Sequence, residues 1–212
     1  MNPVALIVGL VQVLGPARAT QVQPFVPGEA LLRFAAGSAG EKALRQSALS
    51  TPADLTILEG PLNGVGARAR VPLRPVRVGG GGWLVVRIRR DELARQVRDR
   101  LARCREVAQV THEQGDTGKV NARITFRDGS RSARLLERAG GPGGKSQVDS
   151  LVAHIARRIG TPLKGAASGS ELQVEVDLDD LTLQLIERLK ALREVESAQP
   201  NYRVRGFGPR PT

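Results

Sequence analysis

A chain of 212 residues with a net charge of +11 has room for one or two small domains. Its aromatic content of 3% means that any core is built from aliphatic side chains, and its single cysteine, Cys104, excludes an internal disulfide framework. The basic charge is concentrated in residues 66–105, which hold 12 arginines against three acidic residues. A polyanionic partner would explain this segment, but so would a GC-rich genome, because arginine outnumbers lysine 27 to 5.

The N-terminus has the pattern of an export signal. Residues 4–14 are largely apolar and Ala17-Arg18-Ala19 fits a small-x-small cleavage site, although no basic residue precedes the apolar run. We therefore expect residues 1–19 to be a signal peptide and the mature protein to be secreted or periplasmic. No other stretch reaches the roughly 18–20 apolar residues that span a bilayer, so we expect no membrane contact after removal of the signal.

The first elements after this segment form a strand and a short helix. Alternation predicts a strand over residues 30–34, with one face formed by Ala30, Leu32 and Phe34. Ser38 and Glu41 make a capping box, which predicts a helix to about Leu49. A further strand is expected near residues 55–58. Residues 60–82 are rich in glycine, proline and arginine, which predicts a long loop or a ragged hairpin.

The next segment is the first copy of a repeat with an offset of 88 residues. Residues 84–107 align without a gap on residues 172–195. Each copy reads as an alternating strand, an acidic helix start, an amphipathic helix and another strand, which for the first copy lies near residues 107–111. The helices carry apolar side chains at the same spacing, namely Leu93, Val97, Leu101 and Cys104 in the first copy and Leu181, Leu185, Leu189 and Leu192 in the second.

The similarity continues upstream of the second copy. Ala122, Ile124 and Phe126 repeat the alternation of the first strand, and helical spacing follows at Val148, Leu151, Val152, Ile155 and Ile159. The predicted fold class is therefore α+β, with two tandem ferredoxin-like βαββαβ domains over residues 25–115 and 119–207. Each domain is expected to have two helices on one face of an antiparallel sheet and an open face on the other. Residues 116–119 form the linker and residues 208–212 a tail.

The chain offers no recognisable catalytic arrangement. Its two histidines, His112 and His154, belong to no zinc-binding or nucleophile motif, and Gly79–Gly82 is not followed by the lysine of a phosphate-binding loop. We therefore predict a protein that is not an enzyme and that needs neither a metal nor a cofactor.

The ends of the two copies resemble a known family. Val26-Pro27-Gly28-Glu29-Ala30-Leu31-Leu32-Arg33-Phe34 resembles the first strand of the propeptides of subtilisin-like serine proteases. Residues 189–202, with Val-Glu followed by Pro-Asn-Tyr, resemble their last helix and strand. The resemblance covers residues 25–207 as two tandem propeptide-like or inhibitor domains. The chain contains no segment that resembles the protease's own catalytic motifs.

The resemblance implies a protein that binds a subtilisin-like protease as an inhibitor or a folding chaperone. The open sheet face would pack on two surface helices of the protease, and the C-terminal strand would lie in the substrate cleft. The residues expected at this contact are Gln199, Pro200, Asn201, Tyr202, Arg203, Val204 and Phe207, together with Glu113 of the first copy. Phe207 would enter the specificity pocket. Gln199 departs from the family, which often has an acidic residue there to cap protease helices.

Two alternatives remain open from the sequence. The first is an arginine-rich, ferredoxin-like nucleic-acid-binding protein, and the second is the orphan pro-region of a split protease gene. Nucleic acid is the less favoured partner because open sheet faces that bind RNA use aromatic residues, and only Trp83 is available. The outward positions also differ in sign, with Arg87 and Arg89 in one copy and Glu175 and Asp177 in the other. This difference predicts either contact between the two faces, different partners, or drift on a solvated surface. The oligomeric state is left open.

Overall fold

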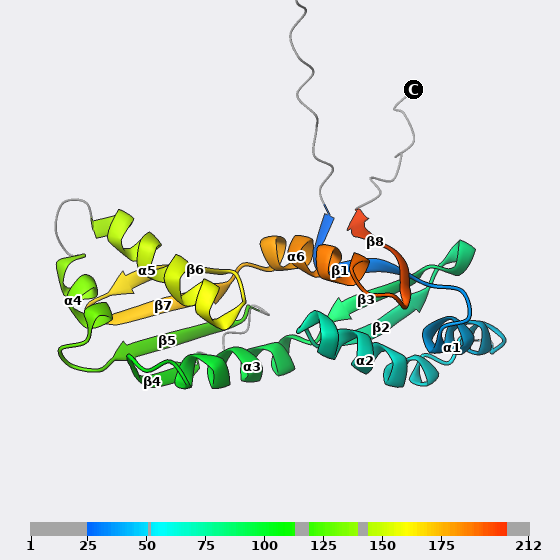
Figure 1. Cartoon of the computed structure of the whole chain (residues 1–212), viewed down its shortest axis with the longest axis horizontal. Helices are drawn as coiled ribbons and strands as arrows, with labels where there is room; N and C mark the ends of the chain where they lie inside the picture. The colour runs from blue at the N-terminus through cyan, green and yellow to red at the C-terminus, as the bar shows by residue number, and fades with distance from the viewer. Residues whose placement is uncertain (1–24, 51, 113–118, 140–143, 203–212) are drawn as a thin grey trace, which may run out of the picture.

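The computed structural model describes residues 25–50, 52–112, 119–139 and 144–202. Within them the chain forms six α-helices and two four-stranded antiparallel sheets, which confirms the predicted α+β class (Figure 1). The elements are β1 (Phe25–Phe34), α1 (Ala39–Ala48), α2 (Glu59–Ala69), β2 (Leu73–Val78), β3 (Leu84–Ile88), α3 (Arg90–Ala102), β4 (Val107–His112), β5 (Asn121–Phe126), α4 (Arg131–Arg138), α5 (Gly144–Ile159), β6 (Leu163–Ser168), β7 (Glu171–Val176), α6 (Leu178–Lys190) and β8 (Val195–Tyr202).

Each sheet takes one edge strand from the other repeat. Sheet A has the order β2-β3-β1-β8, and sheet B has the order β4-β5-β7-β6. This is the strand order of a ferredoxin-like sheet, with the last strand of each repeat exchanged. β8, from the end of the chain, pairs with β1 at its beginning, while β4 of the first repeat pairs with β5 of the second.

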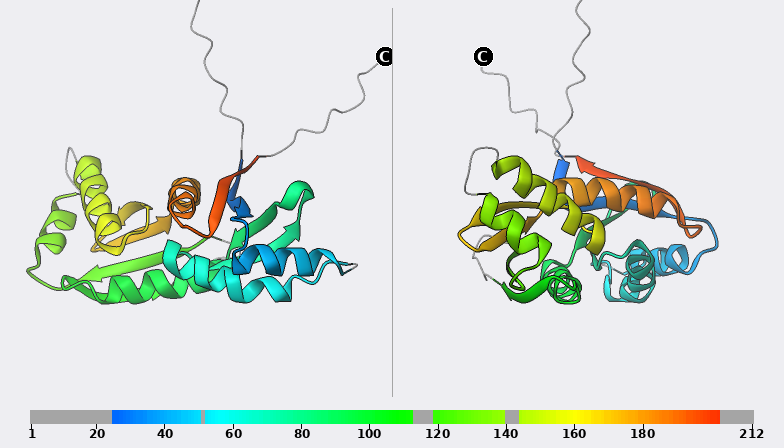
Figure 2. Two further views of the ribbon diagram at one scale, coloured as in Figure 1. Left: turned by 45° about the vertical axis from the view of Figure 1, so that its right-hand side comes forward. Right: turned by 60° about the vertical axis from the view of Figure 1, so that its left-hand side comes forward.

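The expectation that residues 25–115 and 119–207 close as two contiguous domains is therefore wrong. The structure instead forms unit A, made of residues 25–88 and 178–202, and unit B, made of residues 90–112 and 119–176. α6 packs on β1, β8 and α2 in unit A, and α3 packs on β4 and α5 in unit B. Figure 2 shows α6 beside β1 and β8, and α3 along β4.

The chain passes from one unit to the other at two equivalent connections of a single residue each. Arg89 joins β3 to α3 and Asp177 joins β7 to α6, with extended backbone at φ −75°, ψ 97° and φ −74°, ψ 94°. α3 leads away from sheet A toward sheet B, and α6 leads the opposite way (Figure 1). The exchange is possible because the two helices carry the same apolar stripe, so each fits the site that the other would fill. Leu101 and Leu189, at matching positions, are both fully buried.

Residues 55–82 are more regular than their composition predicts. The expected strand near 55–58 is a 3₁₀ turn, Thr56–Leu58, and the expected loop contains α2 and β2. Pro61 is the third residue of α2, where a backbone N–H has no helical partner to lose. The helix is stabilised by burial, since Leu58 just before it and its own Leu62, Val65 and Ala69 are buried at helical spacing.

Gly66 explains why this helix tolerates glycine. A Cβ atom there would lie 2.7 Å from the carbonyl oxygen of Val71, so the turn from α2 into β2 requires the close approach that glycine permits. The other predicted core residues are buried as expected except Leu192, which is partly buried, and Cys104 is 8% exposed. Burial raises the pKa of the Cys104 thiol, which suits a core side chain rather than a reactive one.

Two equivalent arginines form hydrogen bonds with backbone carbonyl groups at the C-terminal ends of helices. Arg100 on α3 donates to the carbonyl of Ile159 at 3.2 Å, at the end of α5. Arg188 on α6 donates to the carbonyl of Ala69 at 3.2 Å, at the end of α2, and also to that of Gly160 in unit B at 3.2 Å. Cationic groups at helix C-termini complement the helix dipole. Arg188 therefore links unit A directly to unit B.

Candidate functional site

The strand that carries four of the eight predicted contact residues, β8, is an edge strand of sheet A. In β8, Gln199 lies opposite Leu31, Pro200 opposite Ala30, and Tyr202 opposite Phe25. Proline is tolerated here because an edge strand has backbone groups that pair with no further strand. Gln199 and Tyr202 are exposed, whereas Pro200 and Asn201 are half-buried. Arg203, Val204, Phe207 and Glu113 lie outside the described residues, as do residues 1–19 and 208–212.

A buried glutamate joins the first strand to the last. Glu29 is 6% exposed, and its carboxylate accepts from Asn201 Nδ2 at 2.7 Å and from Arg87 Nε at 2.7 Å. Arg87 Nη2 also lies 2.5 Å from the same carboxylate. A buried carboxylate needs such partners because burial without them is costly. Glu29 thus holds β8 through Asn201 and β3 through Arg87. Sequence reasoning did not single it out, although it stands within the Val-Pro-Gly-Glu motif.

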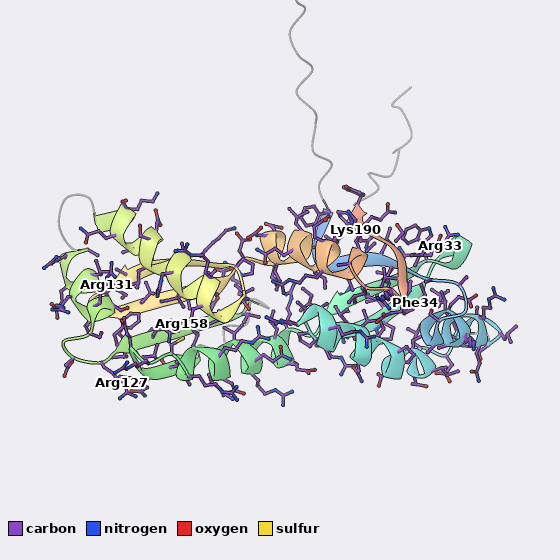
Figure 3. The ribbon with its side chains drawn as sticks, viewed as in Figure 1. Arg33, Phe34, Arg127, Arg131, Arg158 and Lys190 are labelled. Carbon is purple, nitrogen blue, oxygen red and sulfur yellow. The ribbon has the colours of Figure 1, made fainter. Side chains whose placement is uncertain are left out.

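The register of the strands places a mixed surface on the open face of sheet A. One row across the sheet contains Gln199, Leu31, Val85 and Arg77. The neighbouring row contains Glu29, Arg87 and Arg74. Val85 is 1% exposed and therefore covered by its neighbours, so half-buried Leu31 is the apolar side chain of the first row that remains accessible, beside Gln199 and Arg77. Figure 3 labels Arg33 and Phe34 on adjacent positions of β1, which point to opposite faces of the sheet.

A hollow of about 740 Å³ borders the second row. Pro27, Glu29, Arg74 and Arg87 line it from the sheet, and Asp91 and Arg95 line it from the start of α3. The hollow therefore lies where the chain leaves unit A for unit B. It gives the open face a recess of the size that receives side chains or small ligands.

The expected charge complementarity between the two sheet faces has a local explanation. Arg87 pairs with Glu29, and Arg89, which lies at the start of α3, is 3.8 Å from Glu92. In the other unit, Glu175 pairs with Lys119 at 3.1 Å and Asp177 with Lys164 at 2.8 Å. Each of these residues therefore has an oppositely charged partner nearby. The two sheets also lie toward opposite ends of the molecule (Figure 1). The hypothesis that the two open faces pack on each other is wrong.

Glu106 is a second carboxylate with a defined role, in the turn before β4. Its Oε2 accepts from Ser132 N at 3.2 Å and from the Ser132 hydroxyl, at the start of α4. The Ser132 hydroxyl, followed by the Ser132 N–H, His154 and Arg158, lowers the pKa of Glu106, while burial acts against them. The carboxylate therefore completes the N-terminus of α4 beside the Ser130 cap.

We expect the substitution Ser132→Ala to raise the pKa of Glu106 toward its ordinary value. Because the folded pKa is depressed, the ionised carboxylate contributes stability above the unfolded glutamate pKa and loses it as the pH falls through the folded value. The variant should therefore lose less stability between neutral and acid pH than the unmodified protein. An NMR titration of the Glu106 carboxyl, together with thermal unfolding across that pH range, measures both effects. An unchanged Glu106 titration would contradict the assigned cause.

Among the described residues, no group of histidine, cysteine and acidic side chains could hold a metal ion. None of the described helices is both long and apolar enough to span a bilayer. Comparison of the chain with protein-family models, with curated proteins and with solved structures finds no match in any of the three.

Proposed function

We propose that the protein binds a subtilisin-like serine protease through unit A, as an inhibitor or a folding chaperone. One observation carries the proposal. The two segments that resemble the protease propeptides, residues 26–34 and 189–202, are far apart in the sequence but pair as neighbouring strands of one sheet. The 2.7 Å hydrogen bond from Asn201 to Glu29 joins residues of the two motifs directly.

The strand exchange supports unit A as the binding unit. The first repeat has the Val-Pro-Gly-Glu motif but no Pro-Asn-Tyr, and the second has Pro-Asn-Tyr but no Val-Pro-Gly-Glu. Exchange of β4 and β8 places both motifs in unit A and neither in unit B. The proposed binding unit is thus a composite of the two ends of the chain rather than either repeat alone.

The open face of sheet A would meet the protease. Half-buried Leu31 gives this face an apolar contact, and the exposed Arg74 and Arg77, which form no ion pair with another described residue, favour acidic groups on the partner. Glu29 is engaged by Arg87 and Asn201, so Gln199, which is exposed, is the residue placed to reach the protease surface next to the cleft. Residues 203–212, which follow β8 directly, would enter the cleft. The proposal describes a binding protein and assigns no catalytic residue.

An inhibition assay with a secreted subtilisin-like protease from the same source tests the proposal. Residues 20–212 should inhibit the protease, and removal of residues 203–212 should weaken inhibition at least about 30-fold, the loss expected for about 2 kcal/mol at the core of an interface. Gln199→Ala should weaken it less. Thr111→Ala is the matched control, because Thr111 is the equivalent exposed residue of β4 in unit B.

Equal inhibition by the truncated and full chains would reject binding in the cleft. Equal effects of Gln199→Ala and Thr111→Ala would reject unit A as the contact unit. Absence of inhibition together with absence of any gain in protease refolding would reject the function as a whole.

A further inference from the structure

Unit B contains a cavity of about 580 Å³ between α4 and α5. The first turns of α4 contribute Arg131 and Ser132, and the side of α5 that faces them contributes Ser146, Ser150, His154 and Arg157 at helical spacing. Arg158 and Glu106 complete the polar wall. The volume lies within the range of small-molecule sites in proteins. This cavity is open to solvent, and the polar side chains that it presents to a polar ligand are exposed, namely Arg131, Ser146, Ser150, His154, Arg157 and Arg158.

The cavity has an excess of positive charge. Arg131, Arg157 and Arg158 form no ion pair with any residue in the described part of the chain. Glu106 is the one acidic residue in the wall, and its carboxylate is held by Ser132. Counted over its three arginines and Glu106, the wall carries a net charge of +2. Figure 3 shows Arg131 and Arg158 on the two helices that form the cavity.

The duplication provides an internal comparison. The N-caps Ser38 and Ser130 mark equivalent helix starts, and the left-handed residues Arg70 and Gly160 mark equivalent ends of α2 and α5. With these as anchors, the unit A counterparts of Arg131, Ser150, His154 and Arg157 are Ala39, Gly60, Gly64 and Ala67. Arg131, Ser150, His154 and Arg157 thus have no polar counterpart in unit A, whereas Ser146 corresponds to Thr56.

The remaining arginine has an equivalent in unit A, but its environment differs. Arg68 corresponds to Arg158 and Glu194 to Glu106, and in unit A these two form an ion pair. In unit B the glutamate binds Ser132 instead, and Arg158 forms no ion pair with another described residue. Unit A is neutralised at this position, whereas in unit B no carboxylate of the described residues forms an ion pair with Arg158.

We propose that this cavity binds a small phosphate monoester that also carries hydroxyl groups. A phosphate monoester carries about −1.5 to −2 charges at neutral pH, which matches the net charge of the wall. Guanidinium groups bind phosphate in a bidentate manner. Ser146, Ser150 and Gln147 would bind the hydroxyl groups of the ligand, and Gln147 Oε1 is buried with no hydrogen-bond partner among the described residues. No large aromatic ring lines the cavity, so recognition of a nucleobase by stacking is absent from the proposal.

Isothermal titration of the full chain at fixed ionic strength tests the site, with inorganic phosphate, ribose 5-phosphate and ribose as probes. Ribose 5-phosphate should bind more tightly than inorganic phosphate, and ribose should not bind. Arg157→Ala and Arg131→Ala introduce the residues that unit A has at these positions. Each should weaken the binding of ribose 5-phosphate at least about tenfold, because each removes one charge-assisted hydrogen bond. Arg134→Gln, on an exposed position of α4 outside the cavity wall, should leave the affinity unchanged.

Several results would overturn the proposal. If neither inorganic phosphate nor ribose 5-phosphate bound saturably at millimolar concentration, the proposed site would be rejected. Equal weakening by Arg134→Gln and Arg157→Ala would mean that the general positive charge of the protein attracts the probe. Equal affinity for inorganic phosphate and ribose 5-phosphate would reject the organic ligand. None of these results depends on protease binding, because the inhibition assay concerns unit A.

Discussion

Leu101→Ala, a change in the first repeat, should destabilise the sheet built mainly from the second. Leu101 is fully buried on α3, which packs in unit B with β4 and α5. Truncation of a buried leucine costs about 2 to 5 kcal/mol, because it removes apolar contacts and leaves a cavity. Hydrogen exchange should therefore accelerate in residues 121–126 and 171–176 more than in residues 25–34 and 84–88.

Leu189→Ala is the matched variant, and it should have the opposite pattern. Leu189 occupies the equivalent position on α6, is also fully buried, and packs in unit A. Its truncation should cost a similar amount and accelerate exchange in residues 25–34 and 84–88. The exchanged topology therefore predicts that each substitution destabilises the unit built mainly from the other repeat.

Two other outcomes have clear meanings. Accelerated hydrogen exchange in residues 25–34 alone after Leu101→Ala would contradict the exchanged topology, since it would place α3 on the sheet of its own repeat. Equal acceleration in both units after either change would show that the units unfold as one cooperative body, held by contacts such as that of Arg188 with Gly160.

The sequence predicts the elements of this fold better than it predicts their partners. The alternation at Leu84, Val86 and Ile88 and the helical spacing at Leu93, Val97 and Leu101 identify a strand and a helix, and both are present with these side chains buried. The same pattern recurs in the second repeat, which reveals the duplication. That recurrence is also why the sequence cannot assign α3 and α6 to a sheet, because side chains that fit one site fit the other.

The helix α2 shows a different limit. Its glycines and Pro61 lower the helical propensity of residues 59–69, and propensity decided the prediction of a loop. The spacing of Leu58, Leu62, Val65 and Ala69 contained the helical signal, and tertiary burial of these side chains outweighs the intrinsic cost. Close contact at Gly66 became visible only in the structure.

The candidate site was predicted in part. The motif of β8 marked Gln199 through Tyr202, and these residues do form an edge strand. The sequence could not show that their partner is β1 at the other end of the chain, so it assigned the site to the second repeat. Glu29 was missed because a lone glutamate in a strand gives no sign of burial until its partners Arg87 and Asn201 are in place.

Thr182→Val should loosen the junction between α6 and the beginning of β1. Thr182 is fully buried, and its hydroxyl accepts from Gly28 N at 2.7 Å and donates to the carbonyl of Leu178 at 2.5 Å. Valine has nearly the same shape but no hydroxyl, so the buried N–H of Gly28 loses its partner. A buried donor left without a partner costs about 1 to 3 kcal/mol. Thermal unfolding and the exchange rate of the Gly28 amide measure the effect.

Thr182→Ser is the control that separates the hydrogen bond from packing. It keeps the hydroxyl and loses one methyl group, so it should cost less than the valine variant and leave the Gly28 amide protected. A serine variant as unstable as the valine variant would mean that the methyl group, rather than the hydroxyl, holds α6 on β1. The contact also bears on the proposed function, because Gly28 precedes Glu29 and Glu29 binds Asn201. If unit A binds the protease, Thr182→Val should weaken inhibition while Thr182→Ser preserves it, since only the first change loosens the strand that positions β8.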